Sequence, residues 1–287
     1  MKPQVISNSL FLGICISMIS AMTAVIIADY SNSLSDVLYL LLGQYLTGFL
    51  MNVKTTRVTL NLGIRHHFIR LALGLWSFGG YYLALSVEGS SPAMITMILN
   101  AAPMLATLYA TKASGPKTGA MIAFAGIILT LAIPGSGTFG ISFNLPVVLV
   151  GTAALSYTAS ILWLGYMRQC GETATNINFV YNLGGFGVIL ILLTINGWSK
   201  PAHIPSLILV ASMSAVRLQL HTIASRSKEI SANVSVLSNL TFVWIAFYEA
   251  LSGGDHPLSY WTGVVLVIIG TWGTQLKTKS TECKKAT

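Results

Sequence analysis

Long apolar runs follow one another along the whole chain, and they restrict its fold more than any other feature. A helix needs roughly 20 apolar residues to cross a bilayer, and ten runs approach that length. They cover approximately residues 8–28, 34–52, 67–87, 91–111, 117–134, 144–166, 174–195, 204–224, 231–250 and 258–276. Short segments that contain Gly, Pro, Asn or charged residues separate them. The pattern predicts an all-α membrane protein with ten transmembrane helices.

The low charge content indicates the same class of protein. Only 8% of the 287 residues are charged and 54% are apolar, whereas a soluble protein is about 25% charged. A surface with so few charges must face hydrocarbon over most of its area. The segments between the apolar runs are too short for a soluble domain. The lipid bilayer is therefore the main expected partner.

Basic residues indicate how the spans are oriented. Ten spans place both termini on one side, and Lys and Arg gather in cytoplasmic connections. The side of the termini holds Lys2, Lys54, Arg57, Arg65, Arg70, Lys112, Lys117, Arg168, Arg226, Lys228, Lys277, Lys279, Lys284 and Lys285. The opposite side holds Lys200 alone. Both termini are predicted to be cytoplasmic.

The chain ends bear on the choice of membrane. The first apolar run is longer than the core of a signal peptide and lacks an obvious cleavage site, so we expect it to remain as a span. Short connections suit a bacterial inner membrane. The terminal Lys284-Lys285-Ala286-Thr287 resembles a dilysine retrieval signal of the eukaryotic endoplasmic reticulum, which is the alternative location.

Motifs for several other chemistries are missing from the sequence. There is no G-x-x-x-x-G-K-[ST] loop for nucleotides, no H-E-x-x-H for zinc, and no pair of Asp residues within the spans. The cysteines Cys15, Cys170 and Cys283 lack the spacing of a metal site. The basic residues form short clusters rather than one face, which argues against nucleic acid as a partner. We expect no cofactor, no metal and no enzymatic activity.

The two halves of the chain are weakly similar to each other. An offset of 140 residues matches Ala84 with Ala224 and Ser91 with Ser231. Five spans per half is an odd number, so similar halves would enter the membrane in opposite directions, as an inverted repeat. Residues 1–140 would hold spans one to five. Residues 141–287 would hold spans six to ten and a short basic tail.

Local motifs add a resemblance to a known family. They are Tyr82-Leu83-Ala84-Leu85 followed by Ser91-Pro92-Ala93 and Pro103, and Phe247-Tyr248-Glu249 followed by Leu258-Ser259, Gly263 and Gly270. With these motifs and ten spans, nearly the whole chain resembles the EamA-type members of the drug/metabolite transporter superfamily. Tyr109 and Val243 depart from a strict repeat, because they stand opposite Glu249 and Pro103. The resemblance implies a central cavity lined by spans one, three, four, six, eight and nine, with spans five and ten packed peripherally.

Span four carries the first stripe of candidate binding residues. Thr96, Asn100, Pro103 and Thr107 recur at steps of three and four, which places them on one helix face. Pro103 has no amide hydrogen, so the helix can kink there and open a polar pocket. Thr96 and Asn100 are predicted to bind substrate. The alternative is that Asn100 bonds only to neighbouring helices.

Span eight carries a second stripe, formed by Ser214, Arg217, His221 and Ser225. Arg217 could bind a substrate carboxylate or phosphate through its planar guanidinium. It could instead bond to a carbonyl of the bundle or extend to cytosolic water. His221 could bind substrate or couple transport to protons, or it could serve only as a packing donor.

Span nine contributes Ser235, Ser238 and Glu249 on one stripe. The two serines are predicted to bind substrate. Glu249 lies at the predicted outer boundary, where it could titrate or bind a cationic group, or could close an outer gate.

Aromatic and small polar residues of other spans complete the candidate site. The predicted binding residues are Trp76, Ser77, Tyr81, Tyr157, Ser160 and Trp163, and span seven adds Asn178, Tyr181 and Asn182. Aromatic faces with a few polar groups suit a small organic solute. Tyr and Trp also anchor helix ends at membrane interfaces, which is the alternative role.

Paired glycines in spans five and ten predict close helix packing. Gly119 and Gly126 are seven residues apart, as are Gly263 and Gly270. Such spacing lets two backbones approach each other, either within the chain or in a homodimer.

These features predict a secondary transporter that moves a small organic solute, an amino acid or a related amphiphile, without nucleotide hydrolysis. Export is the expected direction. A channel-like facilitator, a membrane-embedded enzyme and a scaffold are the alternatives.

Overall fold

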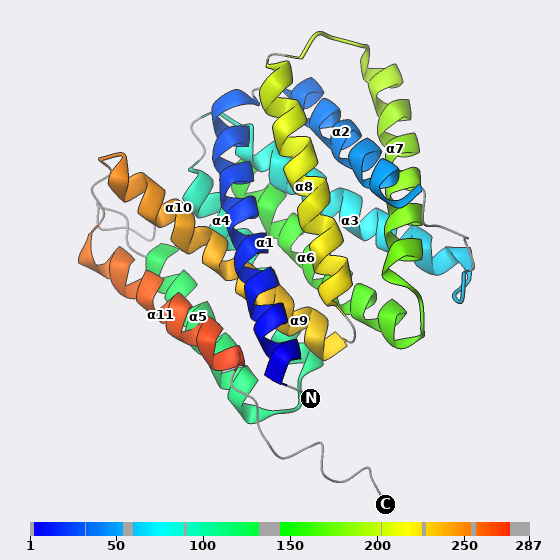
Figure 1. Cartoon of the computed structure of the whole chain (residues 1–287). Helices are drawn as coiled ribbons and strands as arrows, with labels where there is room; N and C mark the ends of the chain where they lie inside the picture. The colour runs from blue at the N-terminus through cyan, green and yellow to red at the C-terminus, as the bar shows by residue number, and fades with distance from the viewer. Residues whose placement is uncertain are drawn as a thin grey trace, which may run out of the picture.

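A computed structural model of the chain describes residues 3–31, 33–53, 60–88, 91–131, 144–201, 203–225, 228–253 and 257–275. Every regular element in these ranges is helical: α1 (Pro3–Tyr30), α2 (Leu34–Val53), α3 (Ile64–Leu85), α4 (Pro92–Ala110), α5 (Ser114–Leu131), α6 (Leu145–Gln169), α7 (Ala174–Asn196), α8 (Ile204–Ala224), α9 (Lys228–Val236), the 3₁₀ turn η1 (Leu237–Asn239), α10 (Leu240–Leu251) and α11 (Leu258–Gln275). Figure 1 shows one bundle, in which the start of α1 and the end of α11 lie at the same end.

The helices occupy the ranges predicted for spans, with small shifts at their ends. Within the described residues, eight helical segments are long and apolar enough to cross a bilayer. The chain is therefore an all-α, multi-pass membrane protein. The helices α5 and α11 are 18 residues each and are not among the eight. The range predicted for span nine is not one continuous helix, because η1 interrupts it between α9 and α10.

Local sequence signals determine where three of the helices begin. The side chains of Ser91, Asn144 and Thr173 each accept a hydrogen bond from the backbone N–H three residues later. Such N-caps satisfy backbone donors that have no partner inside the helix. Pro92 and Pro146 follow in the first turns of α4 and α6, where a missing N–H costs nothing.

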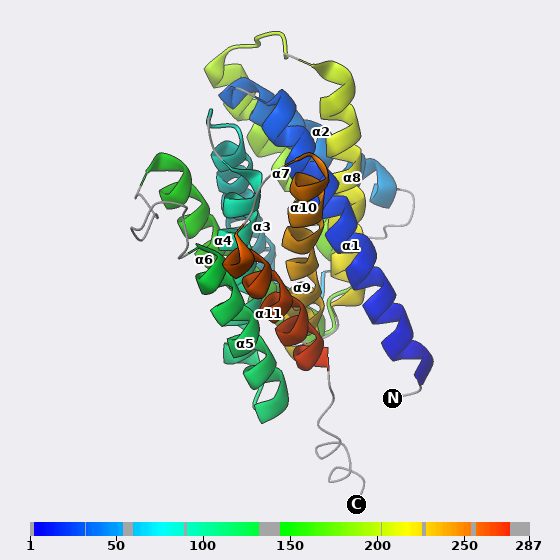
Figure 2. The same cartoon turned by 90° about the vertical axis from the view of Figure 1, so that its left-hand side faces the viewer.

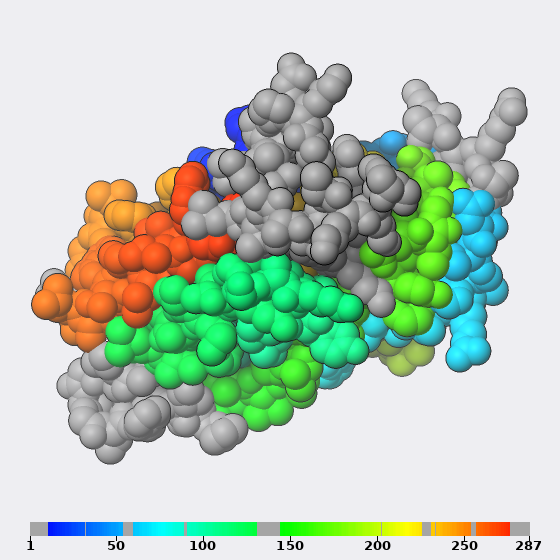
Figure 3. All heavy atoms as spheres, turned by 90° about the horizontal axis from the view of Figure 1, so that it is seen from below, coloured from blue at the N-terminus to red at the C-terminus, as the bar shows by residue number. Residues whose placement is uncertain are grey.

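Helix packing relates the two halves of the chain. The most extensive contacts join α5 with α11, α3 with α6 and α2 with α7, and α1 packs on α8. Figure 1 and Figure 2 show α5 and α11 side by side at one edge of the bundle, away from α2 and α7. Seen from below, α5 and α11 lie next to each other at the surface (Figure 3).

The paired glycines bring the backbones of α5 and α11 together. A Cβ atom placed on Gly126 would lie 2.7 Å from the carbonyl oxygen of Gly263, and one on Gly263 would lie 2.7 Å from the carbonyl oxygen of Gly126. Gly119 and Gly270 face each other in the same way. These glycines are therefore used for packing within one chain.

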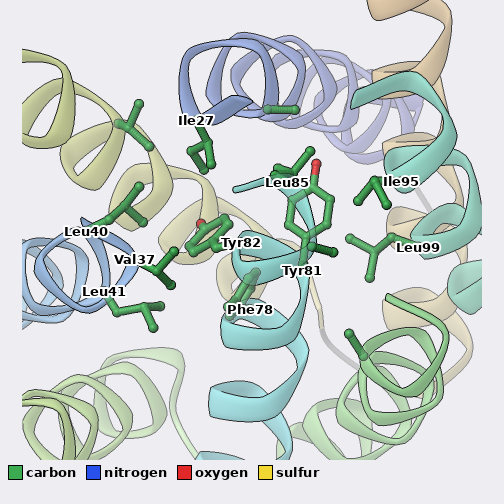
Figure 4. Close-up of a cluster of buried hydrophobic side chains, with 14 of the residues drawn as sticks. Ile27, Val37, Leu40, Leu41, Phe78, Tyr81, Tyr82, Leu85, Ile95 and Leu99 are labelled. Carbon is green, nitrogen blue, oxygen red and sulfur yellow. The ribbon is translucent and has the colours of Figure 1, made fainter. Parts of the chain in front are cut away.

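The largest hydrophobic cluster surrounds the second half of α3. Figure 4 shows Tyr82 on the side of Val37, Leu40 and Leu41 of α2, whereas Tyr81 lies on the side of Ile95 and Leu99 of α4. Both tyrosines are almost fully buried. Because consecutive residues of a helix point about 100° apart, α3 reaches two different neighbours through this pair.

Candidate functional site

A partly open cavity lies in the middle of the bundle, with room for water-sized molecules. Its lining comes from α1, α3, α4, α6, α8 and the segment η1–α10. Nine of the predicted substrate-binding residues line the cavity: Ser77, Tyr81, Thr96, Asn100, Tyr157, Ser160, Arg217, His221 and Ser238.

One wall of the cavity is built by α3 and α4. The hydroxyl of Tyr81 hydrogen-bonds to the hydroxyl of Thr96 at 3.0 Å, which ties the two helices together. Asn100 lies one turn beyond Thr96 and is 4% exposed. Its amide nitrogen is buried without a hydrogen-bond partner among the described residues. The stripe predicted for span four therefore does face the cavity, and Asn100 presents a donor that packing has not used.

Arg70 of α3 also lines the cavity, although its sequence position had placed it among the cytoplasmic charges. The side chain is 4% exposed. Its Nη1 donates a hydrogen bond of 2.7 Å to the hydroxyl of Ser160, and its guanidinium lies 4.7 Å from the ring centre of Tyr181. The structure therefore removes Arg70 from the topological charges and adds a buried cation to the site.

A contact with Tyr45 of α2 fixes the position of the Tyr181 ring. Its hydroxyl pairs with that of Tyr45 at 3.2 Å, and the two rings meet edge to face. Gly74 of α3 leaves the room that the Tyr181 ring occupies. Tyr181 was a candidate for substrate contact, but here it supports Arg70 and is not part of the lining.

Arg217 of α8 extends into the bundle and not towards the near end of its helix. Its Nη1 donates to the hydroxyl of Ser20 at 3.2 Å, and Ser20 lies nine residues inside the apolar segment Phe11–Tyr30 of α1. The guanidinium stands 4.9 Å from the ring centre of Phe78. Placing an Arg at the centre of a membrane helix costs about 2.5–3.5 kcal/mol on insertion scales. One hydroxyl and one ring face offset part of that cost.

The backbone positions of the two arginines lie at similar depth. Arg70 is six residues from the start of α3, and Arg217 is seven residues from the end of α8. At 1.5 Å per residue, each lies roughly 10 Å from its helix end. Because α3 and α8 run in opposite directions through the bundle (Figure 1), these two ends lie on the same side.

His221 completes the stripe of span eight. It lines the cavity, and its Nε2 lies 2.7 Å from the hydroxyl of Ser235. Ser235 is fully buried behind His221 and does not line the cavity. Ser238 does, because η1 changes the helical phase between the two serines.

Three other predicted residues lie outside the lining. Trp76 is 48% exposed on the outer surface of α3. Trp163 donates its indole N–H to the backbone carbonyl of His66 at 3.0 Å and stacks on the His66 ring. Glu249 interacts with Tyr260 of α11, away from the cavity.

The sequence contained a signal for the residue that was missed. Arg70, Gly74, Ser77 and Tyr81 follow one another at steps of four, three and four, so they form a stripe like those of spans four and eight. Ser20, Phe78 and Thr241, which also line the cavity, carry no comparable signal.

Comparisons with known proteins identify the fold and nothing more specific. No family model and no curated protein matches the chain. A solved structure described as "Crystal structure of protein" is similar to it, with a TM-score of 0.67. The similarity covers 93% of this chain and 96% of that one at 10% sequence identity. At that identity the likeness establishes a shared architecture, and function must be argued from the site.

Proposed function

We propose that the chain is a secondary transporter that carries a small organic solute across the membrane by alternating access, without nucleotide hydrolysis. The observation that carries the proposal is the cavity at the centre of the bundle, whose lining includes two arginines, a histidine, an asparagine and several hydroxyl groups. Polar and ionisable groups at this depth are costly, so they mark solute pathways more often than they serve packing. An amino acid or a related amphiphile fits the mixture of aromatic rings, hydroxyls and cations.

The proposal includes ten spans arranged as two inverted repeats, residues 1–140 and 141–287. The packing pattern supports it: if α1 to α5 correspond to α6, α7, α8, the segment α9–α10 and α11, then the α1–α8 pair becomes the α6–α3 pair. The α2–α7 and α5–α11 pairs each become themselves. Such a pattern is typical of transporters whose binding site lies at the repeat interface.

The proposal also includes membership of the EamA-type drug/metabolite transporters. The lining comes from the six spans that the resemblance implies, and α5 and α11 lie at the edge of the bundle. A bacterial inner membrane, with cytoplasmic termini and export as the direction, completes the proposal.

Flux into proteoliposomes tests this function. Purified protein is reconstituted without nucleotide, a mixture of cellular metabolites is added, and the trapped solutes are compared by mass spectrometry with those in protein-free liposomes. We expect selective entry of a few organic solutes. Absence of any selective flux from correctly inserted protein would favour a scaffold or an enzyme.

Counterflow separates a carrier from a channel. A carrier returns faster when its site is loaded, so solute preloaded inside the liposomes should accelerate entry of the labelled solute. A channel shows no such acceleration, and its rate rises with concentration without saturating in the same range.

A further inference from the structure

The cavity contains two permanent positive charges, and no carboxylate among the described residues lines it beside them. Arg70 and Arg217 both line it, and within the described parts of the chain no Asp or Glu does. Glu172 is buried near the start of α7, but its carboxylate accepts hydrogen bonds from the backbone N–H groups of Asn61 and Leu62, each at 3.0 Å. The Glu172 carboxylate therefore binds the connection that precedes α3 and does not face the cavity.

Three buried donors at the cavity have no acceptor among the described residues. They are Nε of Arg70, Nη2 of Arg217 and the amide nitrogen of Asn100. They come from α3, α8 and α4, so they converge on one space from three sides. A buried donor without an acceptor is costly, and more so when it is charged. A ligand that satisfies all three donors supplies acceptor atoms, and negative charge opposite the two arginines.

The aromatic residues of the lining indicate what the rest of the ligand is like. Phe78 lies under the Arg217 guanidinium, and Tyr81 and Tyr157 line the same cavity. Ring faces favour a flat apolar or aromatic body.

Building on the transport function proposed above, we propose that the substrate is a small organic dianion with an apolar or aromatic body. Its charged group, a phosphate monoester or a pair of carboxylates, accepts hydrogen bonds from Arg70, Arg217 and Asn100. Planar guanidinium groups suit both kinds of oxygen acceptor. Two negative charges balance the two arginines, whereas a neutral or cationic solute would leave them uncompensated.

The test is binding to purified protein in phosphatidylcholine nanodiscs, measured as the ligand-induced rise in unfolding temperature. Four probes share a benzene ring and differ in charge: phenyl phosphate, benzoate, benzamide and benzylammonium. Inorganic phosphate is the fifth probe and carries the charge without an apolar ring. We expect saturable stabilisation that is largest for phenyl phosphate and smaller for benzoate. Equal or greater stabilisation by benzamide or benzylammonium would overturn the proposal.

Variants connect the binding to the two arginines. Arg217→Gln and Arg70→Gln should each weaken phenyl phosphate binding by roughly tenfold or more, because each removes a charge-assisted contact. Arg65→Gln is the matched control, since Arg65 is an exposed arginine on the same helix as Arg70. Unchanged affinity in both cavity variants, with normal folded yield, would overturn the assignment.

Three further outcomes distinguish a lipid from a soluble anion and separate the anion proposal from the transport proposal. Stabilisation by phosphatidic acid in the disc, and by none of the soluble probes, would identify a lipid headgroup as the occupant and refute a soluble substrate. Selective flux of neutral metabolites that phenyl phosphate does not inhibit would refute the dianion and leave transport intact. Phenyl phosphate binding that depends on both arginines, without flux of any solute, would support the anion site and refute transport.

Discussion

The α5–α11 pair and the central cavity are both rich in small residues, yet they use them in opposite ways. Between α5 and α11, glycines face glycines, and the backbones meet with no space for a single added carbon. Around the cavity, Ser77, Ser160 and Ser238 share the lining with the long side chains of two arginines and with aromatic rings, and space remains. A small residue in a membrane helix therefore brings two backbones into contact only when the facing position is small as well.

The largest expected effect concerns whether α5 crosses the membrane at all. In a variant with Cys15, Cys170 and Cys283 replaced by Ser, single cysteines are introduced by Lys112→Cys and Leu145→Cys. Both positions are exposed, and they lie on either side of α5. With an impermeant maleimide, we expect Lys112→Cys to label only from the cytoplasmic side and Leu145→Cys only from outside.

Labelling of both positions from the same side would show that α5 does not span. The repeat, and with it the equivalence of α5 and α11, would then fail. Native Cys170 is exposed after α6 and serves as the positive control for the cytoplasmic side in a variant that retains it.

The next effect concerns stability at the glycine contact. Gly126→Ala places a Cβ 2.7 Å from the Gly263 carbonyl oxygen and 2.9 Å from the backbone nitrogen of Val267, which cannot move without separating the helices. Overpacking of this kind costs about 1–3 kcal/mol. We expect a lower unfolding temperature in detergent, measured by a thiol-reactive dye or by fluorescence.

Gly151→Ala is the matched control for this substitution. Gly151 lies in α6 with no atom within 4 Å of its added Cβ. Alanine in a helix is favoured over glycine by about 0.5–1 kcal/mol. A fall in stability at Gly151 equal to that at Gly126 would mean that the close contact is not the cause.

The α5–α11 contact and the central cavity also differ in how well the sequence predicted them. The glycine spacing predicted close packing, and the two partners share the same spacing in the chain. The Arg217–His221 stripe was recognised because charge inside an apolar run is unusual. Arg70 was missed because the span was predicted to begin at residue 67, so a charge at position 70 was indistinguishable from the positive charges that flank spans.

Two smaller differences arise from helix phase. Trp76 and Ser77 are consecutive, so their side chains point about 100° apart, and only Ser77 faces the cavity. Ser235 and Ser238 fit one regular helical stripe, but Ser238 lies within η1, and only Ser238 lines the cavity. A local 3₁₀ turn depends on tertiary contacts, such as the hydrogen bond from Thr241 to the Ser17 carbonyl at 3.2 Å. The position of such a turn therefore could not be predicted from the spacing of residues in the sequence.

On the cavity side, Arg217 should influence transport without affecting insertion. Arg217→Gln should reduce flux and raise the half-saturating concentration by about tenfold or more, since charged hydrogen bonds contribute about 1.5–3 kcal/mol. Arg217→Lys keeps the charge but loses the planar fork, so its defect should be smaller yet measurable. Wild-type affinity in both variants, with equal membrane abundance, would eliminate Arg217 as a binding residue.

The smallest expected effect separates the two faces of α3. Phe78 and Trp76 are two residues apart, but Phe78 lines the cavity beneath the Arg217 guanidinium, whereas Trp76 is 48% exposed outside it. Phe78→Leu keeps an apolar side chain and removes the ring face, which contributes about 0.5–2 kcal/mol to a nearby cation. We expect a several-fold loss of affinity in the proteoliposome assay. Trp76→Leu should change stability by no more than about 0.5 kcal/mol and leave affinity at the wild-type value. If Trp76→Leu weakens binding as much as Phe78→Leu does, then the solute contacts the outer face of α3, and the cavity between the six helices is not its binding site.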